Sequence, residues 1–271
     1  MVIPNLKLNT GASIPQVGLG TWMLTDEKEC KDAVTSALEI GYPHIDTAQA
    51  YHNEQFVGEV MKASGIARKD IFITTKIDVD NMGYRLEDSF NKSLKKLQTD
   101  YVDLLLLHFP MTMYRRPAWP RMEEIYKSGR AKNIGVSNYM INHLEELLAE
   151  CEVRPAVNQF EMHVFLQSPE LVDFCKQQGI VVEAYSPLAR GRRMDDPTLV
   201  AIAKKHKKTS AQIMIRWCIE MGAVTIPKSA HKDRIAENFE VFDFKLDKAD
   251  LKMLKTLDQD FRVSWDPTHV P

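Results

Sequence analysis

The amino-acid sequence predicts an α/β fold, a (β/α)8 barrel of the TIM-barrel class. Eight short apolar runs alternate with segments of helical periodicity along the 271 residues. This alternation is typical of right-handed β-α-β crossovers, and runs that are apolar on both faces are typical of buried parallel strands. About 250 residues form one such barrel. No linker rich in proline, glycine or serine divides the chain, so we predict a single domain over residues 1–271. A doubly wound open sheet is the alternative.

The first element that we expect is a β-hairpin over residues 3–14. Leu6 and Leu8 alternate with Lys7, and the turn-forming residues 9–11 follow them. Alternation with a period of two is typical of a strand that is buried on one face. We predict that this hairpin caps the bottom of the barrel.

The strands and helices of the barrel follow in order. The predicted strands lie at 17–20, 43–46, 71–76, 101–108, 131–137, 156–160, 180–185 and 223–226. After each of them, apolar residues recur every three or four positions, as Leu86, Phe90 and Leu94 do, which is typical of one face of a helix. Two helices are predicted after the seventh strand, at 197–206 and at 210–221, and a last one carries Leu251, Leu254 and Leu257, so the C-terminal part has extra helices.

Composition and charge exclude several classes of function. The formal net charge of −2 gives no general attraction to nucleic acid or to an anionic membrane. The four cysteines are scattered without a Cys-x-x-Cys pair, as reduced thiols of cytosolic proteins often are. The N-terminus lacks the pattern of a signal peptide, and no apolar run is long enough to span a bilayer. We therefore expect a cytoplasmic protein with neither nucleic acid nor membrane as a partner. We further expect a monomer that binds a small molecule.

Polar side chains end three neighbouring predicted strands. The second, third and fourth strands end at Asp46, Lys76 and His108, and Tyr51 follows Asp46 after a short turn. Each residue alone is more often structural, as a helix cap, a surface lysine or a buried aromatic. In a barrel, however, functional groups gather at the carboxyl ends of the strands. We therefore expect these four side chains to meet at one side of the top.

These four residue types together favour a general-acid site. A tyrosine phenol has a pKa of about 10, and a neighbouring ammonium such as that of Lys76 lowers it. Asp46 can keep a buried Lys76 charged, and His108 can donate a hydrogen bond to a carbonyl oxygen. The arrangement predicts carbonyl reduction in which Tyr51 delivers the proton and the hydride comes from elsewhere.

The hydride donor is expected at an unusual dinucleotide site. The segment 18–20 lacks the third glycine and the acidic residue of the usual glycine-rich fingerprint. Instead, Lys228, Ser229 and Arg234 surround the start of a short predicted helix. Cations at a helix N-terminus suit the 2′-phosphate of NADP, although a surface basic cluster is the alternative.

The ends of other predicted strands carry side chains that can bind the planar ring of a cofactor and its carboxamide. Tyr185 ends the seventh strand and can stack on such a ring. Ser137, Asn138 and Gln159 end the fifth and sixth strands and can hydrogen-bond to a carboxamide.

Recurrent motifs cover almost the whole chain. They are His44-Ile45-Asp46-Thr47-Ala48, Tyr51-x-Asn53-Glu54, Thr75-Lys76, Leu106-Leu107-His108, Ile134-Gly135-Val136-Ser137-Asn138, Val157-Asn158-Gln159, Tyr185-Ser186-Pro187-Leu188 and Ile226-Pro227-Lys228-Ser229. Together they closely resemble the aldo-keto reductase superfamily. The resemblance implies an NADPH-dependent barrel enzyme that reduces aldehydes and ketones without a metal.

The resemblance also implies a role for particular residues. The catalytic tetrad corresponds to Asp46, Tyr51, Lys76 and His108. The residues implied to bind NADPH or NADP are Gly20, Thr21, Asp46, Ser137, Asn138, Gln159, Tyr185, Ser186, Leu188, Lys228, Ser229, Arg234, Glu237 and Asn238. The residues implied to line the substrate pocket are Trp22, His108 and Phe109, with Trp265 as a further wall.

Departures from the superfamily pattern concern the pocket walls. Phe109 stands where many relatives have tryptophan, Ile77-Asp78 replaces Leu-Trp, and the loop 110–117 is short. The chain looks most like short bacterial members that reduce diketogluconates, methylglyoxal or assorted aldehydes. One alternative is a regulatory barrel that binds NADPH with little turnover. Another, a metal-dependent hydrolase, needs clustered ligands at the strand ends, where only His108 and Asp46 qualify.

Overall fold

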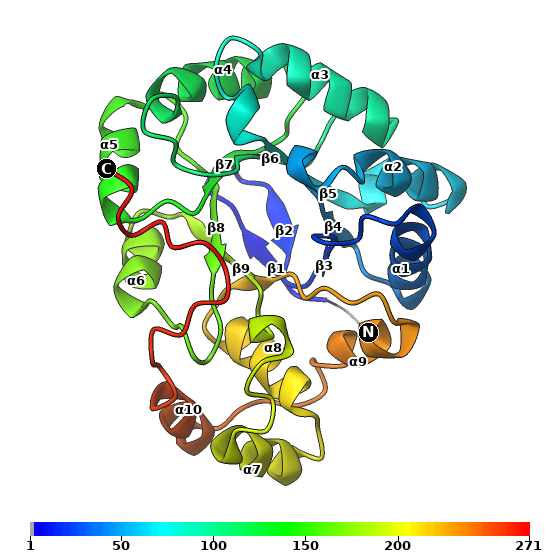
Figure 1. Cartoon of the computed structure of the whole chain (residues 1–271), viewed down its shortest axis with the longest axis vertical. Coiled ribbons are helices and arrows are strands. Elements are labelled where there is room, and N and C mark those ends of the chain that lie inside the picture. Colours follow the sequence, from blue (N-terminus) through cyan, green and yellow to red (C-terminus); the bar gives the residue numbers. More distant parts are fainter. Residues whose placement is uncertain (1–2) are drawn as a thin grey trace.

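The computed structural model describes residues 3–271, which form a closed parallel barrel of eight strands inside a ring of helices (Figure 1). The strands are β3 (Leu19–Gly20), β4 (His44–Asp46), β5 (Phe72–Ile77), β6 (Leu104–Leu107), β7 (Ile134–Ser137), β8 (Val157–Glu161), β9 (Val181–Tyr185) and β10 (Val224–Thr225). Each strand pairs in parallel with the next one in the chain. The sheet closes because Val17, just before β3, bridges to Thr225 of β10, and the N–H of Gly18 donates to the Thr225 carbonyl at 2.9 Å. The predicted (β/α)8 barrel is confirmed, and the open sheet is wrong.

The helices alternate with the strands as the periodicity predicts. They are α1 (Glu27–Ile40), α2 (Glu54–Ala63), α3 (Leu86–Leu97), α4 (Arg115–Lys127), α5 (Ile141–Glu150), α6 (Pro169–Gln177), α7 (Pro197–His206), α8 (Ser210–Glu220), α9 (Lys232–Phe239) and α10 (Lys248–Lys255). Local sequence sets their ends. For example, the Asp26 side chain caps α1, and Gly41, at a φ of 107°, ends it. The extra helices α7 and α10 lie together at one edge of the ring (Figure 1).

The N-terminal hairpin closes the end of the barrel at which the strands begin. Its strands are β1 (Asn5–Lys7) and β2 (Ser13–Pro15), which pair antiparallel. Leu8 and Ile14 are buried and pack with Leu104, Val157 and Val224, residues from the amino ends of barrel strands. In Figure 1 the hairpin is visible through the barrel opening. The predicted cap at the bottom is therefore confirmed.

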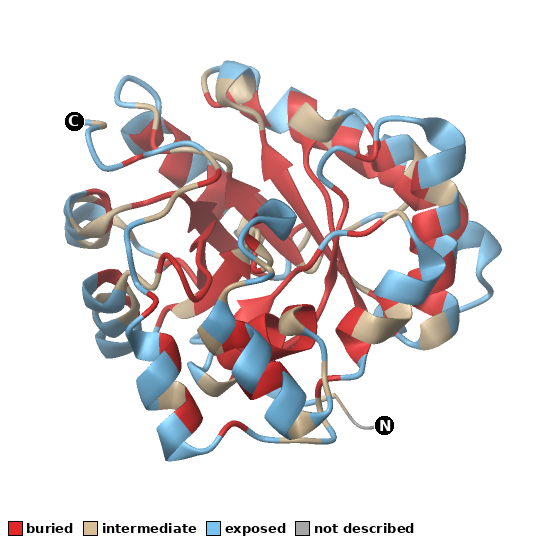
Figure 2. Cartoon of the chain, turned by 60° about the horizontal axis from the view of Figure 1, so that its bottom comes forward, coloured by how far each residue is buried: buried red, intermediate tan, exposed pale blue. Residues whose placement is uncertain are grey.

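The buried apolar side chains of the strands form two layers, one outside the barrel wall and one inside it. Leu105 and Leu107 point outwards into the large core between strands and helices, whereas Leu104 and Leu106 belong to the small core inside the barrel. Figure 2 shows the strands buried throughout and the helices exposed on their outer faces. Towards the carboxyl ends, the interior holds polar side chains that are fully buried, such as Lys76. This polar layer leads into the candidate site.

Candidate active site

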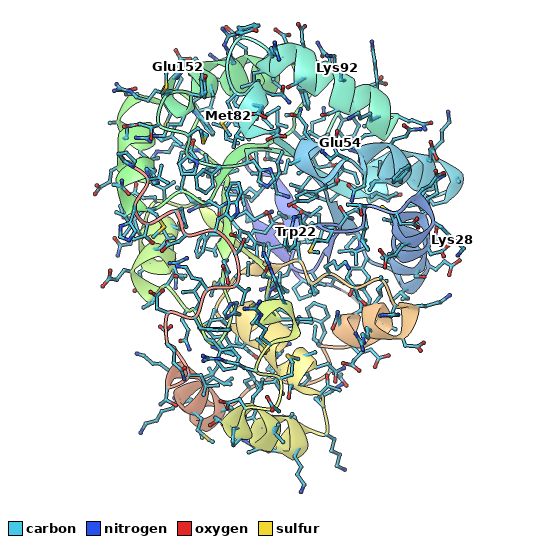
Figure 3. All side chains as sticks on the ribbon, in the orientation of Figure 1. Trp22, Lys28, Glu54, Met82, Lys92 and Glu152 are labelled. Atoms are coloured by element: carbon cyan, nitrogen blue, oxygen red, sulfur yellow. The ribbon has the colours of Figure 1, made fainter. Side chains whose placement is uncertain are left out.

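A cavity of about 1100 Å³ opens at the carboxyl ends of the strands. The sequence-predicted residues that line it are Gly20, Trp22, Asp46, Tyr51, His108, Phe109, Ser137, Asn138, Gln159, Tyr185, Ser186, Leu188, Lys228, Ser229, Arg234, Glu237, Asn238 and Trp265. At Gly20 only glycine fits, because a Cβ atom would lie 2.7 Å from the carbonyl oxygen of Ile226. Figure 3 shows Trp22 over the opening of the barrel. Strand ends far apart in sequence thus share one cavity.

Two predicted residues lie behind the cavity wall. Lys76 is fully buried beneath it. Thr21 is also fully buried, and its hydroxyl donates to the backbone carbonyl of Asp46 at 2.9 Å. The Thr21 side chain therefore fixes the end of β4 and does not line the cavity.

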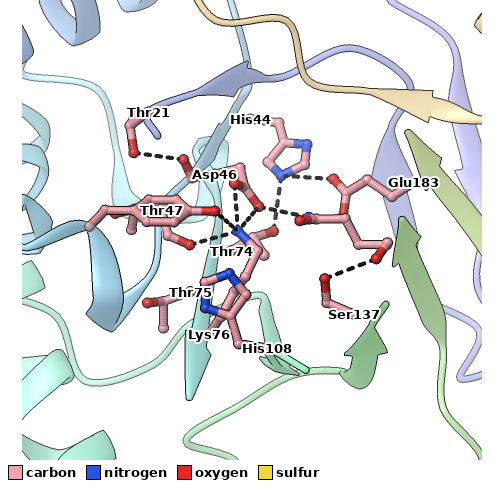
Figure 4. Close-up of polar contacts among 12 residues, drawn as sticks. Thr21, His44, Asp46, Thr47, Thr74, Thr75, Lys76, His108, Ser137 and Glu183 are labelled. Atoms are coloured by element: carbon pink, nitrogen blue, oxygen red, sulfur yellow. Dashed lines mark hydrogen bonds and ion pairs between the residues drawn. The ribbon is translucent and has the colours of Figure 1, made fainter. Parts of the chain in front are cut away.

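Asp46 and Lys76 form a buried ion pair between neighbouring strands (Figure 4). Asp46 lies opposite Thr74 in the register of β4 and β5, so Lys76 projects from the same face two residues further along. Its Nζ lies 2.6 Å from Oδ1 and 2.8 Å from Oδ2 of Asp46, and it donates to the carbonyl oxygen of Thr47 at 3.0 Å. Burial is the largest single influence on Lys76 and would lower its pKa. The charge and hydrogen bonds of Asp46, together with the neighbouring Tyr51 and Glu183, raise the pKa overall, so Lys76 remains an ammonium.

Tyr51 reaches this ion pair from the short 3-10 helix η1 (Gln49–Tyr51). Lys76 Nζ donates to the Tyr51 hydroxyl at 3.3 Å. Gln49 of η1 accepts hydrogen bonds from the Asp78 N–H and the Asn81 amide, both at 3.0 Å. These contacts anchor η1 to the loop after β5 and fix the phenol beside Lys76.

The pKa of Tyr51 corrects one expectation from the sequence. Lys76 does act to lower this pKa, as expected. Burial is the larger influence, however, and it raises the pKa of Tyr51 above its usual value of 10.0. The Tyr51 hydroxyl is therefore a neutral phenol at pH 7, a state in which it can donate a proton.

His108 lies directly after β6 and packs edge-on against Tyr51, with ring centroids 5.6 Å apart. Burial, aided by the positive charge of Lys76, lowers the pKa of His108 to about 3. The imidazole is therefore neutral at pH 7, with one N–H to donate. Tyr51 and His108 both line the cavity, so two donors face the same space.

Asn138 links the ends of several strands. It has a φ of 64°, its amide donates to the carbonyl oxygen of His108 at 3.0 Å, and it accepts a hydrogen bond from the Tyr185 hydroxyl at 2.8 Å. Ser137 donates to the backbone carbonyl of Gln159 at 2.9 Å. The groups predicted for a ring and its carboxamide are therefore held together by one hydrogen-bond network.

The far part of the cavity is cationic. Lys228 and Arg234 line it near the start of α9, with Ser229 between them in sequence. Lys232, on the same helix, pairs with Glu39 at 2.9 Å, but Lys228 and Arg234 have no ion-pair partner among residues 3–271. Two unpaired cations beside a helix N-terminus suit an anionic group.

Some residues of the site are missed by reasoning from the sequence. Glu183 lies fully buried within the apolar strand β9, where a lone acid among buried residues is the available clue. Arg190 places its Cζ 4.2 Å from the Trp22 ring centroid, a contact between two distant loops that no local pattern indicates. Trp265 packs edge-on against Phe109 with ring centroids 5.4 Å apart, which places the C-terminal tail at the pocket as expected.

Among residues 3–271, no cluster of three or more His, Cys, Asp or Glu side chains could hold a metal ion. None of the helices formed by these residues combines the length and the apolar character needed to cross a membrane.

Comparison with known proteins identifies one family. The model of the Aldo/keto reductase family matches residues 16–259. A glyoxal reductase of Bacillus subtilis is 44% identical over 263 residues, 97% of this chain and 95% of that protein. The methylglyoxal reductase DkgA of Escherichia coli is 44% identical over 266 residues, 97% of this chain and 96% of that protein. The crystal structure of an aldo-keto reductase complexed with NADPH superposes with a TM-score of 0.92 at 37% identity, covering 96% of this chain and 89% of that one.

Fold, site geometry and these matches agree over nearly the full length of the sequence. The chain belongs to the aldo/keto reductase family, a family of oxidoreductases that act on carbonyl groups.

Proposed function

We propose that this protein reduces small aldehydes and ketones with NADPH, and that α-oxoaldehydes such as glyoxal and methylglyoxal are among its substrates. The observation that carries the proposal is the hydrogen-bonded group Asp46–Lys76–Tyr51, with His108 beside it, on the wall of a cavity whose far end is cationic. The relatives named for glyoxal and methylglyoxal reduction support the substrate class.

The chain's own residues fit NADPH. The unpaired Lys228 and Arg234 would bind its 2′-phosphate, since both line the cavity without a counter-charge among residues 3–271. Tyr185, Asn138 and Gln159 would contact its nicotinamide end. When bound there, NADPH supplies a hydride for the carbonyl carbon.

The tetrad supplies the proton and orients the carbonyl. The neutral imidazole of His108 donates a hydrogen bond to the carbonyl oxygen and so favours the negative charge that develops on it. Tyr51 donates its phenolic proton to the same oxygen. Lys76 stabilises the phenolate that remains, because its ammonium lies 3.3 Å from the phenol oxygen. Asp46 keeps Lys76 charged and in place.

Loss of NADPH absorbance with a panel that includes glyoxal, methylglyoxal and larger aldehydes and ketones tests this function, with NADH in parallel. We expect turnover of α-oxoaldehydes and a preference for NADPH. Saturable NADPH binding without turnover of any carbonyl would contradict it and favour a regulatory barrel.

We also propose that the enzyme acts as a cytoplasmic monomer. Its four cysteines, Cys30, Cys151, Cys175 and Cys218, are free thiols, which suits a reducing compartment. The tetrad and the cavity are formed within one chain, so a partner is not needed to build them. Sedimentation at micromolar concentration and fractionation of cells test these two points.

A further inference from the structure

A carboxyl group that the proposed reaction does not use, that of Glu183, lies beside His44 (Figure 4). Glu183 of β9 is fully buried inside the barrel. Gln159 Nε2 donates to Glu183 Oε2 at 2.9 Å, and the same nitrogen donates to Asp46 Oδ2 at 2.9 Å. One amide group therefore bridges two carboxyl groups that come from β9 and β4.

This bridge determines which atom Gln159 turns towards the cavity. An amide nitrogen carries two hydrogens, and both are used by the two carboxyl groups. In the opposite orientation the amide oxygen would face both carboxyl groups and Nε2 would face the cavity. Gln159 lines the cavity, so the atom left to interact there is its acceptor, Oε1.

We propose that Glu183 is a positioning residue, which orients the Gln159 amide so that Oε1 accepts a hydrogen bond from the carboxamide N–H of a bound nicotinamide. The proposal rests on the proposed function, since it needs NADPH in the cavity. Glu183 acts only through Gln159.

The surroundings of Glu183 suggest its conservative replacement. Burial, together with the negative charge of Asp46, raises the pKa of Glu183 to about 8, so the carboxyl is protonated at pH 7. His44, whose Nε2 lies 3.7 Å from Glu183 Oε1, has its pKa lowered to about 3 by burial and is neutral. Glutamine therefore matches the neutral carboxyl in size and charge and keeps an oxygen that accepts from Gln159. Leucine keeps the approximate volume but removes that acceptor.

The test uses two cofactors that differ only at the carboxamide. The 3-acetylpyridine analogue of NADP has a methyl group in place of the amide nitrogen and so lacks the hydrogen that Oε1 would accept. Dissociation constants are measured by fluorescence titration at pH 7 for wild type, Glu183→Gln and Glu183→Leu. We expect wild type and Glu183→Gln to bind NADP roughly threefold to tenfold more tightly than the analogue, the range of one hydrogen bond. In Glu183→Leu, where Nε2 keeps only the Asp46 acceptor, this preference should weaken.

A cofactor fragment separates orientation from general damage. Adenosine 2′,5′-bisphosphate lacks the nicotinamide, so all three proteins should bind it equally if Glu183 acts only at Gln159. Three results would overturn the inference: a wild type with no preference for NADP over the analogue, a Glu183→Leu variant that keeps the full preference, or parallel loss of NADP and fragment binding in that variant. The first of these needs no variant to fold. Failure of the wild type to bind NADP at all would overturn the proposed function as well.

Discussion

The carboxylate of Glu161 should control substrate binding from outside the tetrad, because it fixes the C-terminal tail at the pocket. Glu161 is the last residue of β8 and is 2% exposed. Its Oε1 accepts from the N–H of Val263 at 2.7 Å, and its Oε2 accepts from the N–H of Ser264 at 3.0 Å. The next residue, Trp265, packs against Phe109 at the cavity.

The hydrogen-bond donors around Glu161 determine how strongly its substitution should weaken docking of the tail. His163 Nδ1 accepts from the Phe165 N–H at 3.3 Å, so its Nε2 carries the hydrogen and donates to Glu161 Oε1 at 3.1 Å. In Glu161→Gln, one acceptor oxygen is replaced by an NH2 group that must face one of these donors. A hydrogen bond to a charged group contributes roughly 1.5–3 kcal/mol, so docking of the tail should weaken by about 10-fold to 100-fold.

Steady-state kinetics and cofactor binding distinguish this effect from general damage. For Glu161→Gln we expect the KM of a bulky aromatic aldehyde to rise by roughly tenfold, while the Kd of NADPH changes little. Trp265→Ala should raise the same KM, and the double variant should show no further rise because both changes act through the tail. An unchanged KM, or effects of the two substitutions that add in full, would refute the reasoning.

Three other predictions concern charge. Arg234→Ala should weaken NADPH binding by about 10-fold to 100-fold and leave NADH binding unchanged. The control Lys232→Ala should alter the binding of neither cofactor. Equal weakening for both cofactors in binding titrations of Arg234→Ala would contradict the 2′-phosphate contact. Asp46→Asn leaves the Lys76 charge buried and unpaired, so denaturant titration should show a loss of about 3–5 kcal/mol in unfolding free energy. A loss under about 1 kcal/mol would argue against the Asp46–Lys76 ion pair. Burial raises the pKa of Glu183 from 4.5 to about 8, so the folded state binds the extra proton and stability falls as pH rises between these values. Relative to Glu183→Gln, wild type should therefore lose unfolding free energy from pH 5 to pH 8, and parallel pH curves for the two proteins would contradict this.

The barrel and the meeting of its strand ends could be predicted because they depend on local patterns. Apolar runs and helical spacing determine the order of elements, and parallel strands bring their carboxyl ends to one edge. Strand lengths were less predictable. The expected strands at 101–108 and 131–137 begin with an isolated bridge between Val102 and Ala131, and regular pairing of β6 and β7 starts later.

Other features depend on side-chain directions and burial that the sequence does not reveal. The Thr21 side chain, which the resemblance places at the cofactor, donates to the backbone of Asp46. The pKa of Tyr51 was expected to fall because Lys76 is near, but burial decides its sign, and burial is known only from the packed structure. Glu183 and Glu161 act through partners that are far apart in sequence, so no local spacing indicates them.

The Tyr51→Phe variant tests the central claim most directly, because it removes one hydroxyl and keeps the ring that packs against His108. NADPH binding is measured by titration, and turnover of methylglyoxal by loss of NADPH absorbance. If Tyr51 delivers the proton, the variant binds NADPH with nearly the wild-type Kd, and its kcat falls by roughly 100-fold to 10,000-fold, the usual contribution of a general acid. A kcat within a few-fold of wild type would contradict the account.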